Sequence, residues 1–239
     1  DVVKPLENDK EAPAPVRDVT YTKMSGSVLL TYTLPSDPDL LYVAASYTNK
    51  AGKKYEFKAS YFTNTLLVEG FGDTDTYSLD VYAVDRSENY SEPVNIQVAA
   101  DTPPVQAAYE TLEVQPDFGG MTFSFDNASK ADLTVYVSTP NADNEMVNAE
   151  TFYTGLAKAT FSVRGFLDVP RDFEICFEDK WGNRSPVKKE NLTPIYEAEL
   201  DKKKFKEVIL PGDFPCTFYE SKMEYIWDGR AAADGDGQT

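Results

Sequence analysis

The sequence contains no histidine and only two cysteines in 239 residues, and these absences restrict its chemistry. Without histidine there is no Ser-His-Asp or Cys-His catalytic arrangement and no histidine-liganded zinc. Two cysteines are too few for a structural zinc site, and no Gly-rich phosphate loop of the required spacing is present. Paired carboxylates could still hydrolyse glycosides, but no strand-end context singles out a pair. We therefore expect no enzyme activity, no cofactor and no metal.

Basic residues and long apolar runs are also scarce. The chain has 23 Lys and Arg against 40 Asp and Glu, a net charge of −17. A binding face for phosphates needs clustered Lys and Arg, and acids flank the one cluster at 202–204, so we expect no nucleic-acid partner. No apolar run approaches the ~20 residues of a membrane span. Residues 1–11 are charged, contain proline and lack periodicity, which predicts a linker that follows a removed or omitted signal segment.

Aromatic residues and β-formers are abundant. The sequence has 15 Tyr and 14 Phe, and such residues favour pleated, half-buried strands. Alternating patterns predict strands at 29–34, 77–84 and 133–137. No long helical pattern occurs before residue 195, and Pro and Gly punctuate the chain at regular intervals. The predicted fold class is therefore all-β.

A pattern of the form Asp-x-x-x-Asn-x-Ser occurs twice, about 94 residues apart, each time after an alternating strand. The two copies are Asp85, Asn89, Ser91 and Asp179, Asn183, Ser185. Further matches keep the same order: Gly26 with Gly120, Asp39 with Asp132, Val68 with Val163, and Gly70-Phe71 with Gly165-Phe166. A period near 94 residues is the size of one small β-sandwich. The pattern predicts two tandem sandwiches, at 12–101 and 102–194, rather than a single large β domain.

The repeated pattern has a structural and a ligand-binding interpretation. Asp and Asn side chains bond nearby backbone groups and tolerate left-handed conformations, so they build hairpin turns. Ser91 and Ser185 would then begin the last strand, and Pro93 and Pro186 would protect an edge. We favour the turn; ligand contact is the alternative.

The segments 29–43 and 77–94 resemble strands of a fibronectin type III domain. They contain Leu-Leu-Thr-Tyr-Thr-Leu-Pro followed by a second strand, and Tyr-x-x-x-Val-x-Ala-Val-Asp-x-x-x-Asn-x-Ser-x-Pro-Val. That family usually has Trp where this chain has Tyr32 and, in the second copy, Phe125. The resemblance implies two divergent fibronectin type III-like (immunoglobulin-like) sandwiches.

The order of segments along the chain resembles surface lipoproteins of polysaccharide-utilisation loci in gut anaerobes. The motifs are the two repeated strands, Leu210-Pro-Gly-Asp213 and Ile226-Trp-Asp-Gly229. Those proteins join two fibronectin-like domains, largely uncharacterised, to a discoidin-like domain. The resemblance implies that 195–239 begins such a domain, here truncated, with Trp227 in its core. It also implies an outer-membrane, cell-surface location through a lipid-bearing Cys upstream of Asp1.

Trp181 and Tyr90 are the candidate ligand-binding residues. Trp181 lies at the expected tip of the second hairpin, and Tyr90 flanks the corresponding turn in the first copy. Aromatic faces stack on the apolar faces of sugar rings, which suits contact with a glycan. The alternative, which we favour for Trp181, is packing against the neighbouring domain, because junctions between domains commonly bury an aromatic residue.

Two smaller features remain. Cys176 is aligned with Ala83, which predicts a buried free thiol; a bridge to Cys216 is the alternative. Asp234-x-Asp236-Gly237 resembles part of a calcium loop but lacks the distal Glu, so we expect no bound calcium.

Two functional classes fit the sequence. The first is a non-catalytic cell-surface protein of a glycan-utilisation system, whose modules present or assist a C-terminal carbohydrate-binding domain. Its partners would be glycans and other surface proteins of the same system. The second is a structural spacer or protein-contact module within a surface complex.

Overall fold

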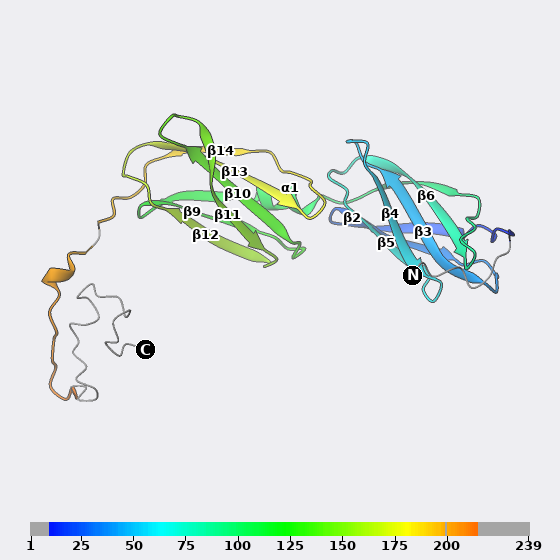
Figure 1. The fold of residues 1–239 in the computed structure, drawn as a ribbon, viewed down its shortest axis with the longest axis horizontal. Coiled ribbons are helices and arrows are strands. Elements are labelled where there is room, and N and C mark those ends of the chain that lie inside the picture. The colour runs from blue at the N-terminus through cyan, green and yellow to red at the C-terminus, as the bar shows by residue number, and fades with distance from the viewer. Residues whose placement is uncertain (1–9, 199, 215–239) are drawn as a thin grey trace, which may run out of the picture. The chain divides into compact units, whose positions relative to one another are not determined.

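The computed structural model describes residues 10–198 and 200–214. The chain divides into a unit of residues 1–195 and a second unit of residues 196–239. The first unit consists of two β-sandwiches, each made of a three-stranded and a four-stranded antiparallel sheet (Figure 1). The predicted fold class, two tandem fibronectin type III-like sandwiches, is confirmed.

The first sandwich uses β1 to β7. Its three-stranded sheet has the order β1-β2-β5 and its four-stranded sheet the order β4-β3-β6-β7. The strands are β1 (Arg17–Met24), β2 (Ser27–Thr33), β3 (Leu40–Thr48), β4 (Lys54–Ser60), β5 (Thr65–Glu69), β6 (Thr76–Asp85) and β7 (Val94–Ala99).

The second sandwich repeats this topology. Its sheets have the orders β12-β9-β8 and β11-β10-β13-β14. The strands are β8 (Glu113–Asp117), β9 (Gly120–Asp126), β10 (Leu133–Pro140), β11 (Met146–Thr154), β12 (Lys158–Arg164), β13 (Arg171–Asp179) and β14 (Lys188–Leu192).

Each sandwich has its own apolar core between its two sheets. Alternate residues of the central strands point inward, because successive side chains of a strand face opposite sides. In β10 this gives buried Leu133, Val135 and Val137, separated by half-buried residues. Tyr32 and Phe125 are both buried at the position where the fibronectin family usually has Trp. The Tyr32 hydroxyl donates to the Thr65 carbonyl at 3.3 Å, which satisfies the polar atom that a phenylalanine lacks.

The match of Gly26 with Gly120 is wrong by one residue. Gly26 and Gly119 are the equivalent pair, since both have a positive φ, of 58° and 62°. Their carbonyl oxygens accept the backbone N–H groups of Phe71 and Phe166, at 3.1 and 2.9 Å. Glycine suits both positions because a left-handed backbone costs it little.

The prediction of a buried thiol at Cys176 is also wrong. The Ser91 hydroxyl accepts the N–H of Ala83, and the Ser185 hydroxyl accepts that of Phe177, so Phe177 is the true counterpart of Ala83. Cys176 therefore lies one residue away, on the outer face of the sheet, and is half-buried. A shift of one residue moves a strand side chain to the other face. Cys216 lies outside the described residues, as do Trp227 and the sequence 234–237.

A short helix between the sandwiches was not predicted. Helix α1 (Pro104–Glu110) buries Val105 and Ala108 in the second core. Seven residues are too few for a clear helical period, and the signal lies instead in Pro104, at a first-turn position that suits proline. The helix precedes β8 and packs on β9 and β13.

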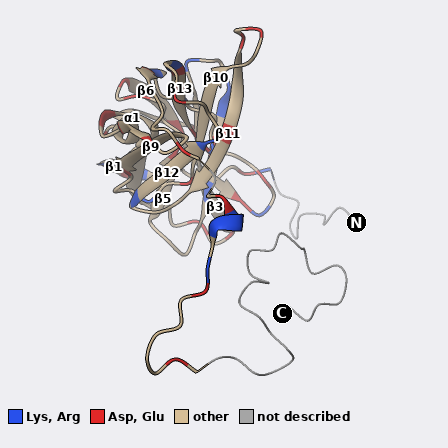
Figure 2. Ribbon diagram, turned by 90° about the vertical axis from the view of Figure 1, so that its left-hand side faces the viewer, with Lys and Arg blue, Asp and Glu red and all other residues tan. Residues whose placement is uncertain are grey.

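The described part of the second unit contains one helical turn, η1 (Lys202–Lys204). The Asp201 carboxylate accepts the N–H of Lys203 at 3.1 Å and lies 3.6 Å from the Lys204 ammonium. The blue turn in Figure 2 is this lysine cluster.

The predicted discoidin-like segment falls largely outside the described residues. Among the described residues, no helix is long and apolar enough to cross a membrane.

Gly120 lies where β9 and β12 approach each other closely, and a Cβ there would overlap the Val163 carbonyl oxygen. We expect Gly120→Ala to lower the free energy of unfolding by about 3 kcal/mol, because the strands must separate to admit the methyl group. Gly52→Ala is the control: its added Cβ meets nothing within 4 Å, so only backbone strain is introduced. Urea denaturation measures both, and equal losses would contradict the close approach.

Burial raises the pKa of Tyr32 to about 12, whereas an unfolded tyrosine has a pKa of about 10. The folded protein therefore holds the phenol proton more tightly, and this contribution to stability is complete below pH 10 and lost as the pH rises toward 12. We expect the free energy of unfolding to fall over this range, and to fall less in Tyr32→Phe. Denaturant titrations at several alkaline pH values measure the slope. Identical slopes would show that Tyr32 carries no part of it.

Candidate functional site

The carboxylate of Asp85 organises the turn between β6 and β7. One of its oxygens accepts the N–H groups of Ser87 and Asn89, both at 2.8 Å, and the other accepts the Asn89 amide at 2.8 Å. Asp85 is fully buried. Its charge is thus compensated by three donors from the turn that it closes.

The turn between β13 and β14 repeats this arrangement. Asp179 accepts the N–H groups of Trp181 and Asn183, at 2.9 and 3.0 Å, and the Asn183 amide at 2.9 Å. Ser91 and Ser185 then bond the strand before each turn through their hydroxyls, both at 3.0 Å. These bonds confirm the turn interpretation of the repeated pattern.

Trp181 packs against the first sandwich. Its ring meets Tyr55 and Phe57 edge-on, with both centroid distances 5.6 Å, and the Tyr55 hydroxyl donates to the Trp181 carbonyl at 3.3 Å. The side chain is part of the periphery of the first core. Trp181 therefore packs against the neighbouring domain, as the favoured interpretation of the sequence expected. Contact of Trp181 with a glycan stays a prediction.

Two further side chains of the same turn contact the first sandwich. The Asn183 amide donates to the Gly70 carbonyl at 3.3 Å, and the Lys180 ammonium lies 3.3 Å from the Glu69 carboxylate. We call the set Lys180, Trp181, Asn183, Glu69 and Gly70, together with Tyr55 and Phe57, the joint. Apolar, hydrogen-bonding and ionic contacts all contribute to it.

Glycines on the first sandwich make room for the joint. A Cβ at Gly70 would lie 3.2 Å from the Trp181 ring, and one at Gly72 would lie 2.5 Å from the Asn183 side-chain oxygen. Gly70 recurs in the second copy as Gly165, but Gly72 has Leu167 as its counterpart. This difference between the copies is the sequence signal for the joint, and the sequence reasoning missed it.

Tyr90 lies elsewhere on the first sandwich. It is 44% exposed, its hydroxyl is 3.2 Å from that of Tyr42, and its ring meets Tyr82 edge-on. The hydrogen bond to Tyr42 and, to a smaller extent, burial raise the pKa of Tyr90 to about 12.

The structure does not bring the two candidate residues together. Tyr90 bridges to Val84 at the end of β6, while Trp181 contacts Tyr55, whose ring stacks on Tyr47 near Tyr77 at the start of β6. Seven residues of strand separate these two ends, roughly 23 Å. A single small ligand therefore cannot contact both. Tyr90 stays an untested candidate on its own.

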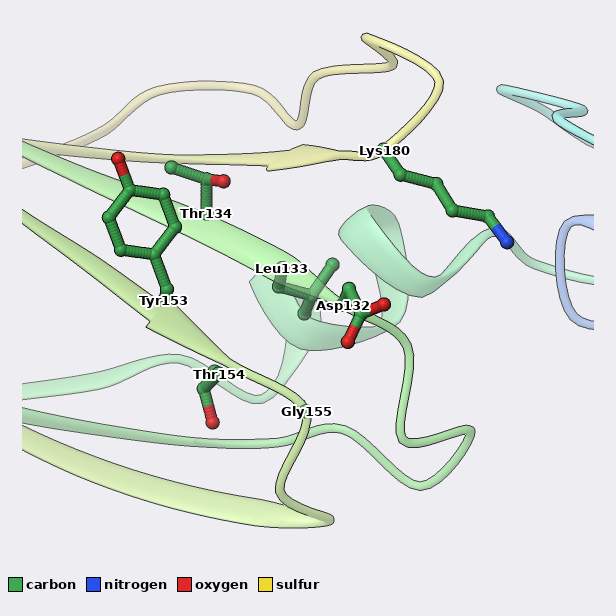
Figure 3. Close-up of a pocket in the computed structure, with 7 residues that line it drawn as sticks. All are labelled: Asp132, Leu133, Thr134, Tyr153, Thr154, Gly155 and Lys180. Atoms are coloured by element: carbon green, nitrogen blue, oxygen red, sulfur yellow. The ribbon is translucent and has the colours of Figure 1, made fainter.

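A pocket of about 420 Å³ lies on the second sandwich where β10 begins and β11 ends (Figure 3). It is lined by Asp132, Leu133, Thr134, Tyr153, Thr154, Gly155 and Lys180. Its volume lies within the range of small-molecule sites, about 300–1,000 Å³. Figure 3 shows the Tyr153 ring beside Thr134, with Asp132 and Lys180 at the other end. The sequence reasoning named none of these residues as a site.

The described residues contain no group of three or more His, Cys, Asp or Glu that could hold a metal ion. Acidic and basic residues are interspersed over the strands and loops in Figure 2, and several pair locally, such as Arg184 with Glu178 at 2.6 Å. The arrangement offers surfaces for contact through aromatic rings and hydrogen bonds.

Two family descriptions match consecutive parts of the chain. Residues 13–100 match the family described as "Domain of unknown function (DUF4959)", and residues 101–203 match "Domain of unknown function (DUF5126)". Each covers less than half of the chain. No curated protein matches the sequence.

Solved structures similar to this chain include "SusE-like protein BT2857", at 32% identity over 53% of this chain with a TM-score of 0.36. The chain spans 45% of that protein's length. A two-domain fibronectin type III segment of chicken tenascin matches 75% of this chain and 99% of its own length, at 15% identity and a TM-score of 0.35. The FN1–FN3 domains of chicken CNTN1 match 76% of this chain and 67% of their own, at 9% identity and a TM-score of 0.35.

We expect Asp85→Ala to lower the free energy of unfolding by about 3 kcal/mol, because three donors of the turn lose a charged acceptor. Glu92→Ala is the control, since Glu92 follows the same turn but its side chain is exposed. Thermal denaturation followed by circular dichroism compares the two. A loss below 1 kcal/mol in Asp85→Ala would mean that the turn closes without its carboxylate.

Proposed function

We propose that this chain is a non-catalytic part of a cell-surface glycan-utilisation system, in which the two sandwiches hold a C-terminal carbohydrate-binding domain in place. The observation that carries the proposal is the joint. A spacer must resist bending between its modules, and the joint supplies contacts of three kinds across them.

The turn between β13 and β14 fixes the side chains that the second sandwich contributes to the joint. Trp181 and Asn183 project from a turn that Asp179 closes, so their backbone is fixed before they meet the first sandwich. Aromatic edge-to-face pairs contribute about 0.5–1.5 kcal/mol each beyond the area they bury. The salt bridge of Lys180 with Glu69 is largely exposed, so it contributes less than 1 kcal/mol. The Trp181 contacts are therefore the main source of rigidity.

The glycan part of the proposal comes from the resemblance of the sequence to surface lipoproteins of polysaccharide-utilisation loci. On this proposal the protein reaches the outer membrane through a lipid anchor upstream of Asp1, and residues 195–239 lead into the binding domain. The domain boundaries at 12–101 and 102–194 belong to the same proposal.

A second function, a spacer or protein-contact module of a surface complex without any glycan, is favoured by one observation. The joint holds the two sandwiches together through aromatic contacts and hydrogen bonds. Rigidity of this kind serves any protein that must hold its ends apart.

We expect Trp181→Ala to free the two sandwiches to reorient while each stays folded, because this side chain lies only at the periphery of the first core. Measurement of ¹⁵N relaxation should give one rotational correlation time for both sandwiches in the wild type and two shorter ones in the variant. The free energy of unfolding should fall by no more than about 2 kcal/mol.

Trp181→Phe, which keeps an aromatic ring, and Phe62→Ala, which removes an aromatic side chain that is 83% exposed, are the controls. Both should tumble as the wild type does. Independent tumbling of the sandwiches in the wild type would refute the spacer, with or without a glycan.

A further inference from the structure

The two sandwiches differ at one matching place on their four-stranded sheets. In the first, Tyr42 of β3 pairs across the strands with Ser60. In the second, Thr134 of β10 pairs with Tyr153. Tyr42 and Thr134 correspond because each pairs with the residue just before the aspartate that closes the turn, Val84 in the first sandwich and Glu178 in the second. The aromatic ring has thus moved from the central strand to the edge strand.

In the first sandwich this place is filled by the protein itself. The Tyr42 hydroxyl is 3.2 Å from that of Tyr90 and 3.3 Å from the Lys58 ammonium, which also lies 4.6 Å from the centre of the Tyr42 ring. These three side chains cover one another.

In the second sandwich the covering side chain is turned away. Arg184 takes the place of Tyr90, but it pairs with Glu178 at 2.6 Å and lies over the Tyr136 ring. Tyr153 is left 76% exposed. Because Tyr153 also lines the pocket, its exposed ring face is available for contact with a ligand bound there.

Around this ring lie polar side chains that form no hydrogen bond or ion pair with other described residues. Among the described residues, no side-chain hydrogen bond or ion pair involves Asp132, Thr134 or Tyr153. Asp132 brings a carboxylate that accepts hydrogen bonds, and Thr134 and Tyr153 bring hydroxyls that donate and accept. Together they offer several directed bonds beside one apolar ring face (Figure 3).

The charges at the pocket favour a neutral ligand over an anionic one. Its lining contains one carboxylate, on Asp132, and one ammonium, on Lys180, which is held by Glu69 at 3.3 and 3.4 Å. An anion would therefore face the unpaired Asp132 carboxylate and a protein of net charge −17. A molecule that carries many hydroxyls and no charge avoids this cost.

We propose that this pocket binds a neutral oligosaccharide, with one sugar ring stacked on Tyr153 and bonding Thr134 beside it, and with hydroxyls of the next sugar donating to Asp132. Asp132 and Thr134 are two residues apart along the chain, roughly 7 Å, so the ligand spans at least two sugar units. The inference deepens the proposed function, on which it rests for the choice of a glycan, by giving the second sandwich a sugar contact of its own.

The test is calorimetric titration of the full 239-residue chain with neutral gluco-, manno- and galacto-oligosaccharides of two to six units. At least one series should bind the wild type. Tyr153→Ala should weaken that binding about tenfold or more, the loss expected for one aromatic stacking contact. Tyr153→Phe should keep most of it, and Asp132→Asn should weaken it several-fold.

Phe62→Ala is the matched control, because Phe62 is an equally exposed aromatic residue on the other sandwich, and its binding should equal that of the wild type. Three results would each overturn the inference: no neutral oligosaccharide bound by the wild type, equal binding by Tyr153→Ala, or preference for acidic oligosaccharides. The tumbling of the sandwiches, measured without glycan, tests the spacer separately, so the two proposals can fail independently.

Discussion

The contact of the second sandwich with the first depends on the carboxylate of Asp179, which holds the backbone of Trp181 and Asn183. By accepting two backbone N–H groups and one amide, this carboxylate fixes a tight connection between β13 and β14. That connection directs Trp181 and Asn183 toward the first sandwich, and places Lys180 between the joint and the pocket. One half-buried acceptor therefore positions groups that hold the two sandwiches together and groups that line a possible binding surface.

Most of the fold could be predicted from the sequence, because alternation of apolar residues and turn chemistry are local signals. The turn role of Asp85 and Asn89 followed from the side-chain chemistry of Asp and Asn. The face of Cys176 did not, because an alignment error of a single residue reverses a strand. Helix α1 was missed because seven residues carry too weak a period, and tertiary packing of Val105 and Ala108 decides it.

The candidate site was harder to predict, because it depends on which residues meet across strands and modules. The sequence singled out Trp181 and offered domain packing as one role, but it could not show that the partners are Tyr55 and Phe57. The pocket was invisible, since Asp132 and Tyr153 lie 21 positions apart and meet only through the pairing of β10 with β11. Comparison of the two copies would have helped, because the positions at which they differ include the residues of the joint and of the pocket.

The end of the second sandwich bears on mechanics. Ile195 is clamped to the corner between β8 and β9 by two backbone hydrogen bonds, both 2.9 Å, to Gly119 and Asp117. Asp101 makes the corresponding bonds to Gly26 and Met24 in the first sandwich. A pull on the chain beyond Ile195 would load this clamp before the force reaches β14. Each module thus has two backbone hydrogen bonds just after its last strand, which would resist tension before that strand is loaded.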